Sequence, residues 1–263
     1  MDLGLKGRVA FVAAASKGLG RAVAEELAAE GADLFICARG KDALEKTRDE
    51  IARETGARVE AMPADLARPA DVRAAVREAI AHFGRVEILV TNAGGPPSGS
   101  FESLTAGMWQ DAVDLTLMSV VNLTAEVIPG MKERRWGRII NVTSIAVKQP
   151  VHGLMLSNSL RSAVTGFAKT LSNEVASFGI TVNSILPGYT RTERVEQLSE
   201  ATAKREGITP SEAAARWESE IPMRRLGEPR EFGALAAFLA SDRASYITGT
   251  SIPVDGGWIK ALL

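Results

Sequence analysis

The stretch from Arg8 to Arg39 constrains the fold of this chain more than any other part of the sequence. It begins with a short apolar run, Val9-Ala10-Phe11-Val12-Ala13, which is typical of a strand buried on both faces of a parallel sheet. Small residues and glycines follow, then an amphipathic helix that ends at Gly31, and a second apolar run over residues 33–38. A strand, a glycine-containing turn, a helix and a strand within about thirty residues form the unit that binds a dinucleotide.

The turn between this first strand and its helix has the small side chains that a phosphate site requires. Its sequence is a G-x-x-x-G-x-G pattern with alanine at the first glycine position. Free N–H groups and the positive dipole end of the helix would face the pyrophosphate. The alternative is a strand-to-helix turn of small residues that binds no ligand. The cofactor contacts expected from this turn are Ala14, Ser16, Lys17, Gly18, Leu19 and Gly20.

Two cations near the turn favour a phosphorylated dinucleotide. Arg39 directly follows the second strand, where an NAD-selective site places an acidic residue on the ribose hydroxyls. An arginine together with Lys17 suits a 2′-phosphate instead, so the sequence favours NADP(H) over NAD(H). The alternative is that both side chains are ordinary solvated charges.

Length and composition exclude several other classes of protein. A chain of 263 residues with 46% hydrophobic residues suits one large α/β domain over residues 1–263. A net charge of −1 predicts no nucleic-acid partner. Cys37 is the only cysteine, so we expect no disulfide framework and no cysteine-based metal site, and the sequence indicates no metal ligand elsewhere. The first seven residues lack the apolar core of a signal peptide, and no apolar run approaches the ~20 residues that cross a bilayer; we expect a cytoplasmic protein without membrane contact.

The rest of the chain continues the alternation of strands and helices. We predict strands over residues 58–62, 87–91, 138–143, 180–186 and 250–254, and helices over 41–55, 70–83, 108–132, 153–178 and 228–241. The alternation predicts an α/β fold with one doubly wound sheet of about seven parallel strands flanked by helices. Residues 193–220 are charged and lack a strong apolar stripe, which indicates a helical substrate lid at about 190–220 or, alternatively, a solvated insertion.

Several predicted strands are followed by residues suited to ligand contact, because ligands of open α/β sheets bind at the carboxyl ends of the strands. Asp65 follows the third strand and either reaches an adenine ring or closes a turn before Pro69. Small residues follow the fourth strand, and a Pro-Gly turn follows the sixth. The cofactor contacts expected here are Asp65, Leu66, Asn92, Ala93, Gly94, Pro187, Gly188, Thr190 and Thr192.

In their order and spacing these segments resemble the classical short-chain dehydrogenase/reductase family over nearly the whole chain. The sequence looks most like the branch that includes 3-oxoacyl-acyl-carrier-protein reductases. The resemblance implies a single Rossmann-type domain, hydride transfer between a nicotinamide cofactor and a small-molecule ketone or secondary alcohol, and a homo-oligomer, either a tetramer or a dimer. The matching segments are Ala14 to Gly20, Asp65-Leu66, Asn92-Ala93-Gly94, Asn141-Val142-Thr143-Ser144, Asn183 to Gly188 with Thr192, and Asp255-Gly256-Gly257.

The catalytic positions of that family are altered in this chain. The family has a serine, a tyrosine thirteen residues later and a lysine four residues beyond it; here these are Ser144, Ser157 and Arg161. The family's helix asparagine corresponds to Thr116. A phenol with a pKa of ~10 can exchange a proton during hydride transfer, whereas a serine hydroxyl is a much weaker acid. Arg161 keeps a positive charge that can hold the cofactor ribose, but it does not release protons at ordinary pH.

Three residues are candidates for a replacement proton donor. Tyr189 lies on the loop that the resemblance places beside the nicotinamide, and Lys148 and His152 lie between Ser144 and Ser157. The alternatives are an aromatic wall for Tyr189, solvated positions for Lys148 and His152, and a strand-end cap for Ser144. The sequence therefore leaves open an NADP(H)-dependent oxidoreductase with a non-standard proton donor, a catalytically silent NADP(H)-binding relative that acts as a sensor or partner subunit, and non-redox chemistry.

Overall fold

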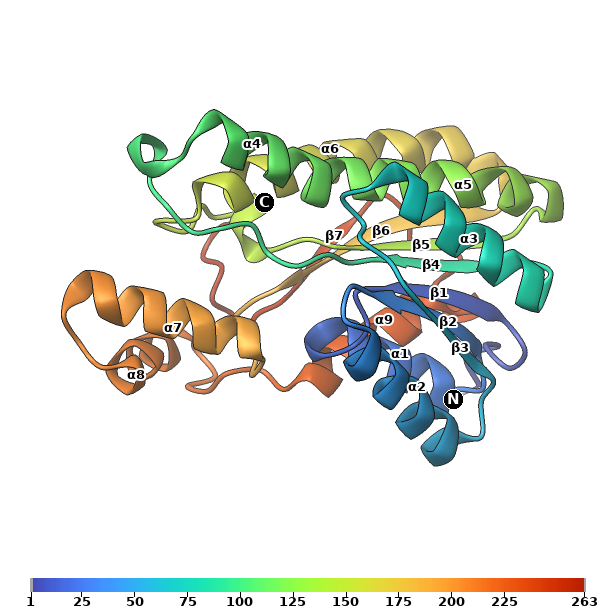
Figure 1. The fold of residues 1–263 in the computed structure, drawn as a ribbon, viewed down its shortest axis with the longest axis horizontal. Coiled ribbons are helices and arrows are strands. Elements are labelled where there is room, and N and C mark those ends of the chain that lie inside the picture. Colours follow the sequence, from blue (N-terminus) through green and yellow to red (C-terminus); the bar gives the residue numbers. More distant parts are fainter. Residues whose placement is uncertain (1, 263) are drawn as a thin grey trace.

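Seven parallel strands form the centre of the computed structural model, which describes residues 2–262 (Figure 1). Their order in the sheet is β3-β2-β1-β4-β5-β6-β7. The predicted doubly wound sheet is confirmed, and each strand begins and ends within one residue of its predicted bounds. The strands are β1 (Val9–Ala13), β2 (Asp33–Ala38), β3 (Val59–Pro63), β4 (Ile88–Thr91), β5 (Gly137–Val142), β6 (Ile180–Pro187) and β7 (Ser251–Val254).

The central strands are apolar because helices cover both faces of the sheet. Every residue of β1 and of β5 is buried. Phe11 and Phe35 pair in register between β1 and β2 and stack with their ring centroids 5.5 Å apart. Burying one such side chain stabilises the fold by about 1.5–3 kcal/mol. Alternate residues of the strands therefore belong to two core layers, one on each face.

The helices form one layer on each side of the sheet (Figure 1). The layer with α1, α2 and α9 includes the closely packed pair α1 and α9, and the other layer contains α3 to α6. The helices are α1 (Gly18–Ala29), α2 (Lys41–Thr55), α3 (Pro69–Phe83), α4 (Ala106–Ala112), α5 (Ser119–Arg134), α6 (Met155–Val175), α7 (Glu193–Glu206), α8 (Pro210–Glu220) and α9 (Pro229–Ala240).

The run from Ala106 to Arg134 differs from its prediction in two ways. It contains a π-helical segment, Val113–Met118, between α4 and α5, where the sequence predicts one regular helix. By length and composition alone it is also long enough and apolar enough to cross a membrane, whereas the sequence predicted no apolar run of that length. A core helix can have the same length and composition, and Leu123 of α5 is buried in the core between the sheet and the layer of α3 to α6.

The charged segment after β6 folds as two helices packed on each other. α7 and α8 lie together as a lobe beside the end of the sheet, at the left in Figure 1. α8 begins with a capping box in which Thr209 and Glu212 satisfy each other's backbone N–H groups. The segment is thus helical, and its role as a substrate lid stays a prediction.

Candidate active site

A cavity of about 590 Å³ lies at the carboxyl ends of the central strands, beneath α7. The helix that follows β1 lies on one face of the sheet, and the helix that follows the neighbouring strand β4 lies on the other face. The two connecting loops therefore diverge and leave space between them. The cavity brings together all of the expected cofactor contacts except Gly20. These are Ala14, Ser16, Lys17, Gly18, Leu19, Arg39, Asp65, Leu66, Asn92, Ala93, Gly94, Arg161, Pro187, Gly188, Thr190 and Thr192.

The glycine turn leaves the start of α1 open to the cavity. Gly18 has a φ of +59°, and no side chain caps the first N–H groups of α1 in the described chain. Gly20 has a packing role instead, since a Cβ there would lie 2.3 Å from the carbonyl oxygen of Ala14. Ala14 itself has a φ of +50°, which is a left-handed conformation that favours glycine.

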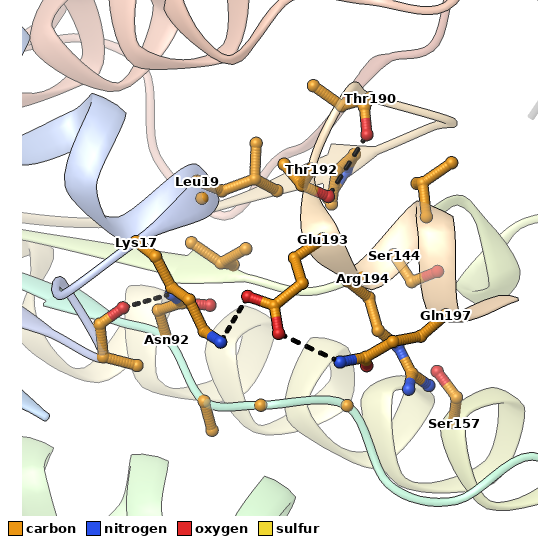
Figure 2. Close-up of a pocket in the computed structure, with 18 of the residues that line it drawn as sticks. Lys17, Leu19, Asn92, Ser144, Ser157, Thr190, Thr192, Glu193, Arg194 and Gln197 are labelled. Atoms are coloured by element: carbon orange, nitrogen blue, oxygen red, sulfur yellow. Dashed lines mark hydrogen bonds and ion pairs between the residues drawn. The ribbon is translucent and has the colours of Figure 1, made fainter. Parts of the chain in front are cut away.

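The two cations that favour a 2′-phosphate differ in their partners. Lys17 forms an ion pair with Glu193 at the start of α7, and Gln197 donates to the same carboxylate at 3.2 Å (Figure 2). Arg39 is exposed beside the cavity and forms no ion pair within residues 2–262. Arg39 is therefore available to a ligand, whereas Lys17 must first leave Glu193.

Asp65 lines the cavity and also closes a local turn. Its side chain accepts a hydrogen bond from the backbone N–H of Ala67 at 3.1 Å, and its own N–H donates to Asp71 at 3.0 Å. These contacts are typical of an aspartate that closes a turn, which is one of the two roles that the sequence allows for Asp65. A contact with the adenine stays a prediction.

Two serines face the cavity from different elements. Ser144 follows β5, and its Oγ accepts a hydrogen bond from the N–H of Ala146 at 3.1 Å, which is the strand-end cap considered above. That bond leaves the O–H of Ser144 free to donate. Ser157 is buried on α6 and lines the same cavity.

Arg161 is held against the end of β5. Its Nη1 donates to the carbonyl oxygens of Val142 and Thr143, both at 2.9 Å. Burial, together with the nearby charge of Arg194, lowers the pKa of Arg161 to about 10. The guanidinium therefore remains a cation at neutral pH, as the sequence predicts.

The contacts of Tyr189 favour the aromatic wall over the proton donor. Its ring stacks on Trp217 with the centroids 4.6 Å apart and meets the edge of Trp258 at 5.9 Å. Burial and the charge of Glu220 raise the pKa of Tyr189 to about 12. A phenol with so high a pKa is a poor proton donor near neutral pH.

The other proposed catalytic residues do not line this cavity. Thr116 is buried in the π-helical segment, and its hydroxyl has no hydrogen-bond partner among the described residues; the neighbouring Leu115 lines the cavity instead. His152 lines a second cavity of about 340 Å³ that shares Tyr189 with the first, and Lys148 lines neither. A catalytic role for Thr116 stays a prediction.

Arg194 is a cavity residue that the sequence did not single out. It comes from the first turn of α7, and its Nη2 donates to the carbonyl oxygen of Pro96 at 3.0 Å. Figure 2 shows its guanidinium pointing toward Ser157. An arginine in the first turn of a helix opposes the helix dipole, and this was the signal available in the sequence.

The fold and the cavity together define a protein of the Rossmann type with the parts of a dinucleotide site. A glycine turn after β1, a cation after β2 and polar groups after β4 to β6 are the parts of such a site. A family model described as enoyl-(acyl carrier protein) reductase matches residues 13–259. The chain belongs to the short-chain dehydrogenase/reductase family and is an oxidoreductase of that family.

Known relatives cover nearly all of the chain. The 3-oxoacyl-(acyl-carrier-protein) reductase FabG of Vibrio cholerae is 33% identical over 255 residues, 97% of this chain and 98% of that protein. L-Sorbose reductase from Gluconobacter frateurii, solved with NADPH and L-sorbose, is 34% identical, with a TM-score of 0.94 and 100% of both chains covered. A variant of actinorhodin polyketide ketoreductase solved with NADPH is 32% identical, with a TM-score of 0.93 and coverage of 97% and 98%. The family resemblance expected from the sequence is thus confirmed.

Proposed function

We propose that the protein transfers hydride between NADP(H) and a ketone or secondary alcohol, with a proton donor other than the family's tyrosine. The observation that carries this proposal is that one cavity holds the glycine turn, Arg39, Ser144 and Arg161. The two solved relatives named above are NADPH complexes, which supports NADP(H) as the cofactor of this chain.

The residues around the glycine turn fit a bound dinucleotide. A Cβ at Gly94 would meet nothing within 4 Å, and a Cβ at Gly18 would meet only the side chain of Thr192, so the backbone there is open to a ligand. The start of α1 would hold the pyrophosphate, and Arg39 with Lys17 would hold the 2′-phosphate. When bound, the nicotinamide supplies the hydride.

The chain's own groups would orient the carbonyl and stabilise charge on its oxygen. The free O–H of Ser144 can donate to that oxygen, and the charge of Arg161 lies in the same cavity. Neither Arg161 nor Tyr189 is a good proton donor near neutral pH, because their pKa values are about 10 and about 12. We therefore propose that no single side chain is the donor: the oxygen that hydride transfer leaves charged takes its proton through water near the hydroxyls of Ser144 and Ser157, and bulk solvent restores the proton to that water.

The test measures loss of NADPH absorbance over a panel of ketones, with NADPH binding measured in parallel, for the wild type and for Tyr189→Phe. We expect turnover in both proteins, with the two rates within about threefold, since removal of a true general acid costs ~10²–10⁴. A loss of that larger size in Tyr189→Phe would assign the proton step to Tyr189 and overturn the role of water.

The silent alternative is favoured by the change of both proton-handling positions to Ser157 and Arg161. Silence of the wild type on every ketone, with NADPH bound, would support this alternative, especially if the double variant Ser157→Tyr with Arg161→Lys gained activity. A homo-oligomer, a cytoplasmic location and the absence of a nucleic-acid or membrane partner stay predictions.

A further inference from the structure

Two arginines share one end of the cavity without an acidic partner. Arg161 comes from α6 and Arg194 from α7, and both are partly buried. No carboxylate among residues 2–262 lies within 4.0 Å of either guanidinium. Arg191, on the loop just before α7, makes the contrast clear, because it pairs with both Glu218 and Glu228 outside the cavity.

Most of the hydrogen-bond donors on these two guanidiniums are unused. A guanidinium carries five N–H groups. Arg161 uses only Nη1, on two carbonyl oxygens, and Arg194 uses only Nη2, on Pro96. The remaining N–H groups of both have no acceptor within the described part of the chain. Burial lowers the pKa of Arg194 as it does that of Arg161, which is the sign of cations deprived of water without compensation by an anion.

The phosphates of a dinucleotide do not account for these cations. The start of α1, Lys17 and Arg39 lie at the part of the cavity formed by β1 and β2. Arg161 is bonded to the end of β5, and Arg194 points toward Ser157 (Figure 2). The two guanidiniums therefore face the side of the cavity where Ser144 would meet the reacting carbonyl.

On the basis of the proposed function, we propose that Arg161 and Arg194 together bind an oxyanion of the substrate, a carboxylate or a phosphate. The substrates would then be oxo acids or phosphorylated ketones and the corresponding alcohols, rather than neutral carbonyl compounds. Guanidinium groups suit this role because their planar donors match the oxygens of carboxylate and phosphate groups. Arg194 is a specificity-determining residue in this proposal, and the hydride and proton steps do not pass through it.

Gly95 permits the observed position of Arg194. A Cβ at Gly95 would lie 2.8 Å from Cζ, Nε and Nη2 of Arg194, so a side chain there would push the guanidinium away. Gly95→Ala thus displaces the charge without removing it. Arg194→Met removes the charge, Arg194→Lys keeps it without the planar donors, and Arg191→Met removes an arginine that does not line the cavity.

The test is calorimetric titration of the NADP⁺-saturated protein with unreactive probes, phenylacetate against the uncharged phenylacetamide. We expect phenylacetate to bind at least about tenfold more tightly, since that ratio corresponds to one charge-assisted hydrogen bond. Arg194→Met should abolish the preference, Gly95→Ala and Arg194→Lys should reduce it, and Arg191→Met should leave it unchanged. A second pair, phenyl phosphate against phenol, identifies the oxyanion as phosphate if its ratio is the larger.

Equal binding of charged and uncharged probes in both pairs, no binding of any probe, or an unchanged preference in Arg194→Met would overturn the oxyanion site. The proposed function fails by a different result. If the anions bind preferentially but no carbonyl compound supports oxidation of NADPH, the oxyanion site is supported and the proposed reductase activity is overturned. Turnover of neutral ketones without any anion preference would support the reductase and overturn the oxyanion site.

Discussion

At the scale of single residues, the glycine turn departs from the dinucleotide-binding pattern at one position. Ala14 stands where the dinucleotide turn has its first glycine, and it adopts a φ of +50°. A left-handed alanine places its Cβ too close to the following carbonyl oxygen, which costs about 1–2 kcal/mol. The turn is nevertheless formed: the carbonyl oxygen of Ala14 lies where a Cβ at Gly20 would be 2.3 Å away, and the side-chain amide of Asn92 donates to the same oxygen at 3.4 Å.

Ala14→Gly should therefore stabilise the protein slightly. Relief of the left-handed strain outweighs the greater freedom of glycine in the unfolded chain, about 0.4–1 kcal/mol, so we expect a net gain of up to about 1.6 kcal/mol in the free energy of unfolding. Urea denaturation measures it. Ala13→Gly is the matched control, since Ala13 is buried in the extended strand β1, and it should lose more than about 1 kcal/mol. Equal losses in the two variants would show that Ala14 is not strained.

At the scale of elements, α7 connects the lobe to the glycine turn. Glu193 and Arg194 are neighbours in its first turn, yet Glu193 pairs with Lys17 of the glycine turn whereas the guanidinium of Arg194 points toward Ser157 (Figure 2). The Lys17–Glu193 pair is about half exposed on both sides, so its contribution to stability is small. The ion pair matters for ligand binding instead, because a bound phosphate and the carboxylate of Glu193 would compete for Lys17.

Glu193→Ala should strengthen NADP⁺ binding. Release of Lys17 from an exposed pair recovers at most about 1 kcal/mol, so the dissociation constant should fall by up to about fivefold. The effect should shrink as the salt concentration rises. Glu196→Ala is the control, since Glu196 lies in the same turn without an ion pair in the described chain, and it should change the affinity little. Weaker binding in Glu193→Ala would mean that Glu193 positions Lys17 for the ligand.

The elements also show where sequence reasoning was sufficient and where it was not. Apolar runs predicted the five inner strands, because strands covered on both faces must be apolar. The edge strands β3 and β7 are only partly buried, and the alternation of strands with helices predicted them. The π-helical segment around Thr116 left no trace, since a change of helical pitch alters neither composition nor the spacing of apolar residues enough to be read. Arg194 was missed because, in a charged segment, one arginine that folds inward resembles those that stay in solvent; its position in the first turn of a helix was the one signal against that interpretation.

At the scale of the whole molecule, the order of the strands determines where these residues meet. Ala14, Arg39, Asn92, Ser144 and Gly188 are separated by as much as 174 positions in sequence, yet each follows a parallel strand and all line one cavity. That convergence could be predicted, because parallel strands have their carboxyl ends at one edge of the sheet. The shape of the substrate end could not, because it depends on how α7 packs over that edge.

A nucleotide bound in this cavity should stabilise the folded state. At a concentration of about 100 times its dissociation constant, NADP⁺ adds about 2.7 kcal/mol to the free energy of unfolding, which raises the melting temperature of a domain of this size by roughly 5–10 °C. NAD⁺ at the same concentration should raise it less, because it lacks the phosphate that Arg39 would bind.

Calorimetric melting of wild type and Arg39→Ala with each nucleotide tests this expectation. Arg39→Ala should bring the NADP⁺ shift close to the NAD⁺ shift while leaving the melting temperature of the free protein nearly unchanged, since Arg39 is exposed and has no ion-pair partner in residues 2–262. Lys41→Ala is the matched control, because Lys41 is exposed nearby and pairs only with Glu45 in the described chain. The preference for NADP(H) would be refuted by equal shifts with NADP⁺ and NAD⁺ in the wild type. A shift with neither nucleotide would refute the dinucleotide site as well.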